Sequence, residues 1–431
     1  MPAKRSWHRR GRSDPKRRQM TTRWWPSGGL WRHPDFLKLW AAQSLSAMGS
    51  RITRTALPMI AILTIDGSPT EIAILSALGV LPGVVVGLLA GGLIDRRPKR
   101  PLLIATDLVR ALLILTIPLA AWSGALAMPQ LYLVAAAIGA ASALFRIADN
   151  AYLPALIGKE ALVEGNAKLE ATDSIAESVG PGLAGILIQA LTAPVAVIVD
   201  ALSYLWSALL LGRIRAAETL AASPEAGTSV IGDIRIGLRA CLDHPVVARL
   251  LAAETLMALF GGFFNTLYMI LALETLALSP LVVGLIISVG GIGSLLGALV
   301  AERMAGRLGL GPMLLLTLAL GSAAALLVPL SELVRPLAVA SLVMHQVIGD
   351  AFLSIYLIHA VSLRQRVLPL DILGRANATF HVATGLALPI GALVAGPLAD
   401  AIGMSATMWI GAVGGLSAAV ALLSPAVLRL R

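Results

Sequence analysis

Charge is scarce in this sequence. Only 13% of its 431 residues are Asp, Glu, Lys or Arg, whereas 57% are hydrophobic, and the mean hydropathy is +0.83. Soluble domains carry about 25% charged residues and roughly 45–50% apolar ones. A chain with so little charge cannot cover a water-facing surface, which excludes a cytosolic enzyme and a nucleic-acid-binding protein.

The few charges are also unevenly placed. The net charge is +10, but residues 1–35 hold ten Lys or Arg against Asp14 and Asp35, so this segment carries +8 and the rest only +2. A nucleic-acid-binding face would need its cations on the folded part. No apolar run follows the basic start, so it is not a secretory signal. We expect residues 1–35 to form a basic, disordered cytosolic tail that touches lipid headgroups, with no nucleic-acid partner.

Residues that build reactive sites are scarce as well. The only cysteine is Cys241, which excludes a disulfide framework and a cysteine-based metal site. The six histidines show no H-x-x-x-H or H-E-x-x-H spacing, and neither a G-x-S-x-G nor a P-loop motif occurs. We therefore expect no metal, no cofactor and no enzymatic activity, ATP hydrolysis included.

Long hydrophobic runs are abundant. A membrane-crossing helix needs about 20 mostly apolar residues, and twelve such stretches follow one another. They are 36–63, 71–94, 102–123, 128–149, 168–191, 193–213, 246–275, 281–304, 312–330, 335–359, 375–401 and 404–427. We predict an all-α membrane protein of twelve transmembrane helices. It comprises an N-terminal six-helix bundle at 36–213, a cytosolic linker at 214–245 and a C-terminal six-helix bundle at 246–431.

The placement of Lys and Arg indicates the orientation, because positively charged connectors stay in the cytoplasm. With the N-terminus inside, the inner connectors and their edges contain Arg96, Arg97, Lys99, Arg100, Lys159, Lys168, Arg213, Arg215, Arg235, Arg239, Arg303, Arg307, Arg364, Arg366, Arg429 and Arg431. Arg335 alone lies near an outer connector. We expect a multi-pass protein of the bacterial cell membrane with both termini cytoplasmic.

The two halves of the chain repeat each other at an offset of 211 residues. The matched pairs are Pro69 and Pro280, His33 and His244, Arg96 and Arg307, Asn166 and Asn377, Gly180 and Gly391, and Gly185 and Gly396. One ungapped offset thus runs from before the first span into the fifth. Two six-helix repeats in parallel are the architecture of a transporter with two bundles about a central path.

With these features the chain resembles the major facilitator superfamily over residues 36–428. The first inner loop reads G-G-L-I-D-R-R-P-K-R over residues 91–100, beside the family pattern G-x-L-x-D-R-x-G-R-K, with Pro98 where Gly is usual. An acid just after a helix end and among four cations can pair with a base and cap a neighbouring helix, so we expect this loop to latch the two bundles in one state. Its candidate residues are Gly91, Asp95, Arg96, Lys99 and Arg100. The alternative is that these cations only set the topology.

The fifth span contains a second motif. Gly180, Pro181, Gly182 and Gly185 resemble the G-P-x-x-G-G signature associated with exporters of this superfamily, with Ala184 in place of one Gly. The segments 49–58, 200–204 and 374–378 are similar to the branch that contains siderophore exporters and macrolide efflux pumps. The resemblance therefore implies export rather than uptake.

Ionisable residues inside a membrane are costly and mark functional positions by default. The candidates for handling protons or substrate are Arg51, Asp107, Arg110, Arg146, Asp149, Asp173, Glu177, Asp200, His345 and Asp350. Most lie in the N-terminal bundle and do not recur at the 211 offset, where Asp107, Asp173 and Glu177 map to Leu318, Thr384 and Leu388. We expect transport to depend on the first bundle's acids.

The roles of these charges are open between two interpretations. Asp173 and Glu177 share one face of span five with Glu170, and a carboxyl shielded from water can exchange a proton during a cycle. Arg51 is expected to face the transport cavity.

Two further pairs are spaced i,i+3, Asp107 with Arg110 and Arg146 with Asp149. We expect the members of each pair to neutralise each other and hold helices together. A lone intramembrane histidine such as His345 is more often a satisfied helix contact than a functional group.

These features favour a secondary active transporter. We predict a proton-coupled exporter of an organic small molecule, such as a drug, macrolide or siderophore, that works by alternating access in the lipid bilayer. The alternatives are a proton-coupled nutrient permease and a membrane sensor without flux. A monomer encloses its own path, so we expect a monomer.

Overall fold

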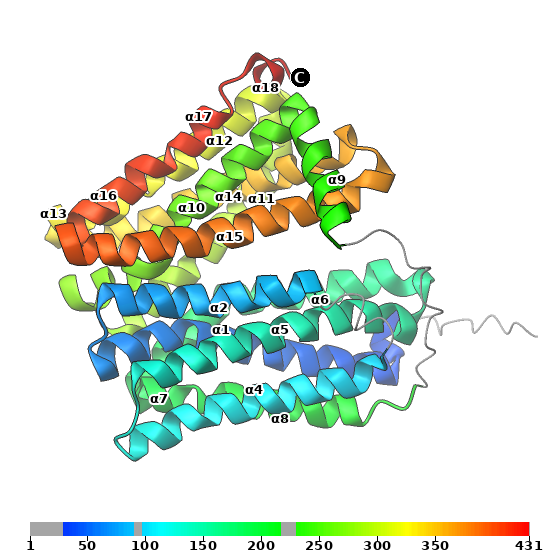
Figure 1. Ribbon diagram of the computed structural model, residues 1–431, viewed down its shortest axis with the longest axis vertical. Coiled ribbons are helices and arrows are strands. Elements are labelled where there is room, and N and C mark those ends of the chain that lie inside the picture. The colour runs from blue at the N-terminus through cyan, green and yellow to red at the C-terminus, as the bar shows by residue number, and fades with distance from the viewer. Residues whose placement is uncertain (1–28, 90–96, 217–229, 431) are drawn as a thin grey trace, which may run out of the picture.

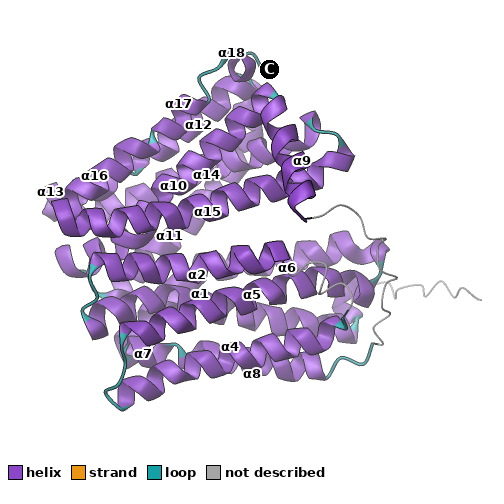
Figure 2. Cartoon of the chain, viewed as in Figure 1, coloured by secondary structure: helices purple, strands orange, loops and turns teal. Residues whose placement is uncertain are grey.

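The computed structural model of the chain describes residues 29–89, 97–216 and 230–430, and all regular secondary structure in these ranges is helical. Figure 1 shows two groups of long helices lying side by side, one formed by each half of the chain. Figure 2 shows that short loops connect neighbouring helices. The chain is therefore an all-α protein built as two bundles.

The first bundle lies between residues 29 and 212. Its helices are η2 (Gly29–Arg32), α1 (Pro34–Ile65), α2 (Pro69–Leu89), α4 (Lys99–Trp122), α5 (Met128–Ile157), η3 (Lys159–Ala161), α6 (Leu162–Leu191), α7 (Ala193–Ala196) and α8 (Ile198–Gly212).

The second bundle follows α9 (Val230–Asp243), a helix inside the segment expected to be a polar linker. Its helices are α10 (Pro245–Ile270) continuing as the π-helical η4 (Leu271–Thr275), α11 (Pro280–Leu308), α12 (Leu310–Ala324), α13 (Leu327–Leu333), η5 (Arg335–Leu337), α14 (Ala338–Val367), α15 (Leu370–Ile402), α16 (Met404–Gly415), α17 (Ser417–Ala421) and α18 (Pro425–Leu428).

Within the described ranges, 11 helical stretches are long and apolar enough to cross a membrane. The one predicted span missing from these 11 is the first, which corresponds to α1. This helix has 32 residues, and Arg51 and Arg54 lower its mean hydropathy. The count of twelve spans in a six-plus-six arrangement thus agrees with the structure.

The predicted disordered tail extends too far along the chain. Residues 29–32 form η2, where Leu30 is 1% exposed and packs with Phe36. The backbone N–H of Leu30 also donates to Oε1 of Glu164 at 3.0 Å. The prediction is therefore wrong for residues 29–35, because Leu30 has a place in the core; residues 1–28 lie outside the described part.

The repeated His-Pro pairs begin the first helix of each bundle. Nδ1 of His33 accepts from the N–H of Phe36 at 2.9 Å, and Nδ1 of His244 accepts from the N–H of Val247 at 3.4 Å. Pro then occupies the first helical position in both α1 and α10, where it lacks only an N–H that would have no partner. This local chemistry explains why the pair recurs.

The bundles meet through two helix pairs, α2 with α15 and α6 with α11. We call the two ends of the molecule the 66–68 end, where α1 joins α2, and the linker end, where α8 leads towards α9. A Cβ on Gly185 would lie 2.6 Å from the Pro280 carbonyl oxygen, and one on Gly396 would lie 2.7 Å from that of Pro69. The bundles are therefore in backbone contact at the 66–68 end.

Candidate functional site

A cavity of about 830 Å³ lies on the linker-end half of the first bundle. Its lining comes from α1, α4, α5 and the first part of α6, which begins at Leu162. Its ionisable lining residues are Arg51, Arg54, Arg110, Arg146, Asp149, Glu170 and Asp173. The volume suits an organic molecule of drug size, and four arginines in one membrane-embedded cavity are unusual.

Arg51 joins α1 to the acidic face of α6. Its Nη2 lies 3.2 Å from Oδ2 of Asp173, and its Nη1 pairs with Oε2 of Glu177. The arginine side chain is 13% exposed, whereas the side chains of Asp173 and Glu177 are 52% and 61% exposed. Gly180 admits this approach, because a Cβ there would collide with Cβ of Arg51. The two carboxylates thus stay accessible while they neutralise Arg51.

Arg54 and Arg146 lie on the same cavity wall and are both exposed. Electrostatically, Arg54 interacts with Arg51 and Arg146 and with the carboxylates of Glu177 and Asp173. In the described part of the chain neither Arg54 nor Arg146 forms an ion pair within 4.0 Å. Arg54 follows Arg51 by one turn but was not among the candidates for handling protons or substrate.

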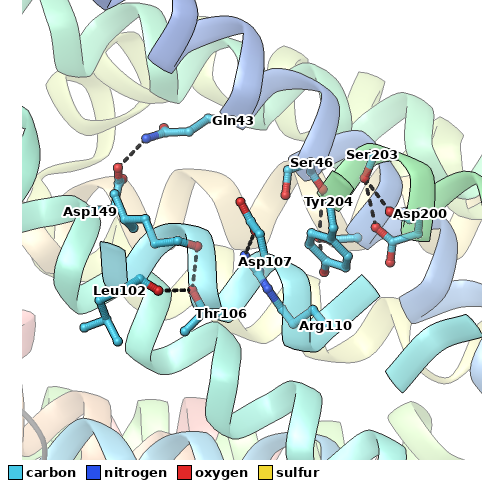
Figure 3. A network of polar contacts seen from close by, with 12 residues as sticks. Gln43, Ser46, Leu102, Thr106, Asp107, Arg110, Asp149, Asp200, Ser203 and Tyr204 are labelled. Atoms are coloured by element: carbon cyan, nitrogen blue, oxygen red, sulfur yellow. Dashed lines mark hydrogen bonds and ion pairs between the residues drawn. The ribbon is translucent and has the colours of Figure 1, made fainter. Parts of the chain in front are cut away.

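The predicted pair of Asp107 and Arg110 is formed in the interior of the first bundle. Nη2 of Arg110 donates to Oδ1 of Asp107, whose side chain is fully buried. The guanidinium also lies over two aromatic rings, 4.5 Å from the centroid of Phe145 and 4.2 Å from that of Tyr204. Figure 3 shows Asp107, Arg110 and Tyr204 close together. These contacts hold α4, α5 and α8 together, as expected of a structural pair.

Asp200 on α8 is completely buried close to α1. Its Oδ1 accepts from the hydroxyl of Ser203 at 3.2 Å, while Oδ2 has no hydrogen-bond partner among the described residues. Gly49 leaves room for both side chains, since a Cβ there would strike them. A buried carboxyl with an unpartnered oxygen is a candidate for water contact or proton exchange.

Asp149 does not pair with Arg146 as the i,i+3 spacing suggested. Oδ1 of Asp149 accepts from Nε2 of Gln43 on α1, as Figure 3 shows. The prediction of an Arg146–Asp149 pair is wrong because spacing places residues on one helix face but does not show what the neighbouring helix offers. Asp149 instead links α5 to α1.

The second-bundle candidates, His345 and Asp350, lie on α14 and face α10, α11 and the end of α12. Nδ1 of His345 donates to the carbonyl oxygen of Ala324 at 3.0 Å, and its ring stacks on Phe264 with centroids 6.2 Å apart. His345 is therefore a satisfied helix contact, as expected of a lone histidine. Asp350 lies against Gly290, where a Cβ would meet Oδ2 of the aspartate.

A buried ion pair in the second bundle escaped the sequence interpretation. Nη1 of Arg364 on α14 lies 3.2 Å from Oε2 of Glu254 on α10, and the side chains are 9% and 8% exposed. The guanidinium also lies 3.9 Å from the ring centroid of Phe380. The sequence had placed Arg364 among the topology signals. The repeat contained a signal for this pair. Glu254 is the 211-offset partner of Gln43, which forms a polar link between the equivalent helices of the first bundle.

Three members of the predicted latch loop, Gly91, Asp95 and Arg96, lie outside the described residues. Nε of Arg100 donates to the carbonyl oxygen of Leu211 at 2.8 Å, and Nζ of Lys99 donates to that of Arg97 at 2.6 Å. Arg100 thus bonds the last carbonyls of α8, where a cation also complements the helix dipole.

The exporter-type motif lies where α6 meets α11. The N–H of Gly182 donates to Oγ of Ser288 at 2.8 Å. A Cβ on Gly185 would lie 3.1 Å from Cα of Leu281, and a Cβ on Gly284 would strike the carbonyl oxygen of Pro181. Gly182, Gly185 and Pro181 therefore form the contact between bundles, while Gly180 faces Arg51 within the first bundle.

Known proteins share this sequence and arrangement. A family model for the Major Facilitator Superfamily matches residues 39–353. The chain is 30% identical over 388 residues to the multidrug efflux pump Tap of Mycolicibacterium fortuitum, covering 87% of this chain and 91% of Tap. It is 22% identical over 239 residues to macrolide efflux protein A of Streptococcus pyogenes, covering 56% and 59% of the two chains.

Solved structures show the same fold. A bacterial homologue of the iron transporter ferroportin in its inward-facing state superposes with a TM-score of 0.72 at 17% identity, covering 90% of this chain and 98% of that one. An outward-facing structure of such a homologue, at the same identity and coverage, gives 0.58. Both superpositions show that the chain has the fold of these transporters.

Proposed function

The chain belongs to the Major Facilitator Superfamily, and on this premise we propose that it is a proton-coupled exporter of an organic small molecule that works by alternating access. As a member of a transporter family it is a multi-pass membrane protein and not an enzyme. The names of Tap and macrolide efflux protein A support the direction of transport.

The observation that carries the proposal is the charged wall of the cavity. Arg51 holds Asp173, which lines the cavity, and Glu177, and both carboxylates stay more than half exposed. A carboxylate that pairs with a cation and also reaches water can exchange the cation for a proton, which gives transport a step that depends on the proton gradient. Substrate binding at the same wall would couple the two events.

The direct test is accumulation of the anion fluorescein and of the cation ethidium in cells with and without the protein. We expect lower accumulation of at least one of them in cells that express it, and no difference once an uncoupler collapses the proton gradient. Higher accumulation in expressing cells would identify an uptake permease instead. Equal accumulation of both compounds in energised cells would contradict the exporter proposal for this class of compound.

We further propose that the linker end faces the cytoplasm of a bacterial cell, as the distribution of Lys and Arg favours. Leu370 is 85% exposed at the linker end, and Ser123 is exposed at the 66–68 end. An impermeant thiol reagent should label Ser123→Cys in intact cells and spare Leu370→Cys. Burial raises the pKa of the Cys241 thiol, so the native cysteine should react little with the reagent. The reverse labelling pattern would overturn the orientation.

The latch remains a proposal of the same kind. Asp95 is an acid among four cations, and its 211-offset partner is Gly306. Asp95→Asn should reduce turnover far more than it reduces membrane abundance, with Arg97→Gln as a control for lost charge. A mutant that transports normally would leave the loop as a topology signal only.

A further inference from the structure

Two of the four arginines in the cavity have no carboxylate of their own. Arg51 is held by Asp173 and Glu177, and Arg110 by Asp107. In contrast, Arg54 and Arg146 form no ion pair within the described ranges, and both side chains are exposed to the cavity. Both guanidinium groups are therefore free to bind a solute that enters the cavity.

The local charge balance around Arg54 is positive. The groups that act on it are the guanidiniums of Arg51 and Arg146 and the carboxylates of Glu177 and Asp173. Three cations and two anions thus act at this position, while Asp149 and Glu170 also line the cavity but form no ion pair with Arg54 or Arg146 in the described part of the chain. Arg54 and Arg146 also repel each other, so a bound anion would relieve their repulsion as well as add its own attraction.

Arg54 lies at a depth where a charge without a function would destabilise the protein in the membrane. It precedes the end of α1 at Ile65 by 11 residues, about 17 Å along the axis at 1.5 Å per residue. This places it close to the middle of a hydrocarbon core of about 30 Å. An arginine at this depth is costly and persists where it faces a water-filled cavity or a partner.

Topology and scaffold do not account for either residue. Cations that set topology lie at the ends of spans, whereas Arg54 and Arg146 lie within α1 and α5. The second bundle has Asn265 and Leu357 at the 211-offset positions, and its equivalent helices, α10 and α14, form without a guanidinium there. The fold therefore does not need a guanidinium at these places.

We propose that Arg54 and Arg146 form an anion-recognition site and that the transported molecules carry an acidic group, such as a carboxylate, on an apolar body. A guanidinium offers a planar fork that matches a carboxylate with two parallel hydrogen bonds. Phe145 and Leu153 supply apolar surface beside it. This inference rests on the proposed transport function and specifies the substrate class for the same cavity.

The test compares two dyes that share one aromatic skeleton and differ in charge. Fluorescein is an anion at neutral pH and rhodamine 6G is a cation. Binding of each to the purified full-length protein is followed by fluorescence anisotropy for the wild type, Arg54→Gln, Arg146→Gln and the double variant. Arg335→Gln is the matched control, since Arg335 is an exposed arginine at the 66–68 end without an ion pair among the described residues.

We expect saturable fluorescein binding that weakens about tenfold in each single variant, the equivalent of roughly 1.4 kcal/mol, and further in the double variant. Arg54→Lys should lose less, because it keeps the charge and loses only the fork. Rhodamine 6G should bind no more weakly to the variants, and Arg335→Gln should not change either dye. If a Gln variant does not fold, Arg54→Lys and Arg146→Lys provide the comparison.

Absence of saturable fluorescein binding, or equal binding by the wild type and the double variant, would overturn the anion site. Accumulation of both dyes in cells separates this result from failure of the exporter proposal. Energy-dependent efflux of rhodamine 6G alone would support export and contradict the anion site. Fluorescein binding that depends on Arg54 and Arg146, without efflux of either dye, would support the site and contradict export.

Discussion

The crossing of α1 with α6 and the crossing of α10 with α15 occupy equivalent places in the two halves of the chain. In the first, Arg51 reaches Asp173 and Glu177. In the second, the residue equivalent to Arg51 is Gly262, where a Cβ would strike the carbonyl oxygen of Leu388. Leu388 is itself the equivalent of Glu177. One crossing is held by charges beside a cavity and the other by backbone contact.

A second pair of equivalent crossings shows the same divergence in another form. Gln43 on α1 donates to Asp149 on α5, whereas its equivalent, Glu254 on α10, binds Arg364 on α14. Both bundles keep a polar link between these helices, but donor and acceptor change sides. The repeat therefore preserves where helices meet and leaves the chemistry of the meeting free to differ.

The contact between bundles is the region where the two halves agree. Gly185 meets Pro280, and their equivalents Gly396 and Pro69 meet each other in the same way. Each bundle thus supplies one glycine and one proline to a pair of matching contacts. Symmetry is retained where both bundles must move against each other and is lost where one bundle holds the charged cavity.

The largest effect is expected from enlarging Gly262, because the second crossing has no room. A Cβ at Gly262 would lie 2.6 Å from the backbone nitrogen of Ala392, so Gly262→Leu must force α10 and α15 apart. Overpacking of this kind costs about 1–3 kcal/mol or more. We expect most of the folded protein to be lost, as measured by membrane abundance and gel filtration.

The neighbouring Gly261 provides the control for that substitution. A Cβ there would meet no atom within 4 Å, so Gly261→Leu should retain most of the folded protein. Equal abundance of the two variants would show that the crossing of α10 with α15 can accommodate a side chain at residue 262.

The next effect concerns the acids of the first crossing. Asp173→Asn and Glu177→Gln should each preserve abundance, because both side chains are more than half exposed and contribute little to packing. Proton-dependent efflux should fall about tenfold or more, while efflux without a gradient should change little. The measurement is efflux from vesicles with an imposed pH gradient, with Glu170→Gln at the cavity mouth as the control.

Full proton-dependent efflux in Asp107→Asn, Asp173→Asn and Glu177→Gln alike would remove coupling from the first bundle. Asp350 would then be the next carboxyl to examine, since it lies in the second bundle and acts electrostatically with Glu177.

The sequence predicts most of the fold and only part of the site. Span positions, the repeat and the Asp107–Arg110 pair depend on periodicity and local spacing, which a single chain records directly. Links between distant helices are different. Glu254 and Arg364 are 110 residues apart, and nothing in their local sequence shows that α10 and α14 bring them together. The 211-residue offset between Gln43 and Glu254 indicates that Glu254 lies at a helix contact, but it does not identify Arg364 as its partner.

The smallest effect should be the same in both halves. Gly185→Ala and Gly396→Ala each place a methyl group less than 3 Å from a proline carbonyl oxygen at the 66–68 end. Small residues at a helix contact permit the close approach that closes this end, so either methyl group should disfavour the closed arrangement. We expect transport to slow about threefold in each variant. Labelling of Ser44→Cys in the cavity should fall by a similar factor, measured from the linker side in a Cys241→Ala background. The control is Gly87→Ala on α2, where a Cβ would meet no atom within 4 Å, and it should change neither quantity. A large effect from Gly185 and none from Gly396 would mean that the asymmetry of the charged crossings extends to the contact between bundles, and that the exporter-type motif acts through α6 alone.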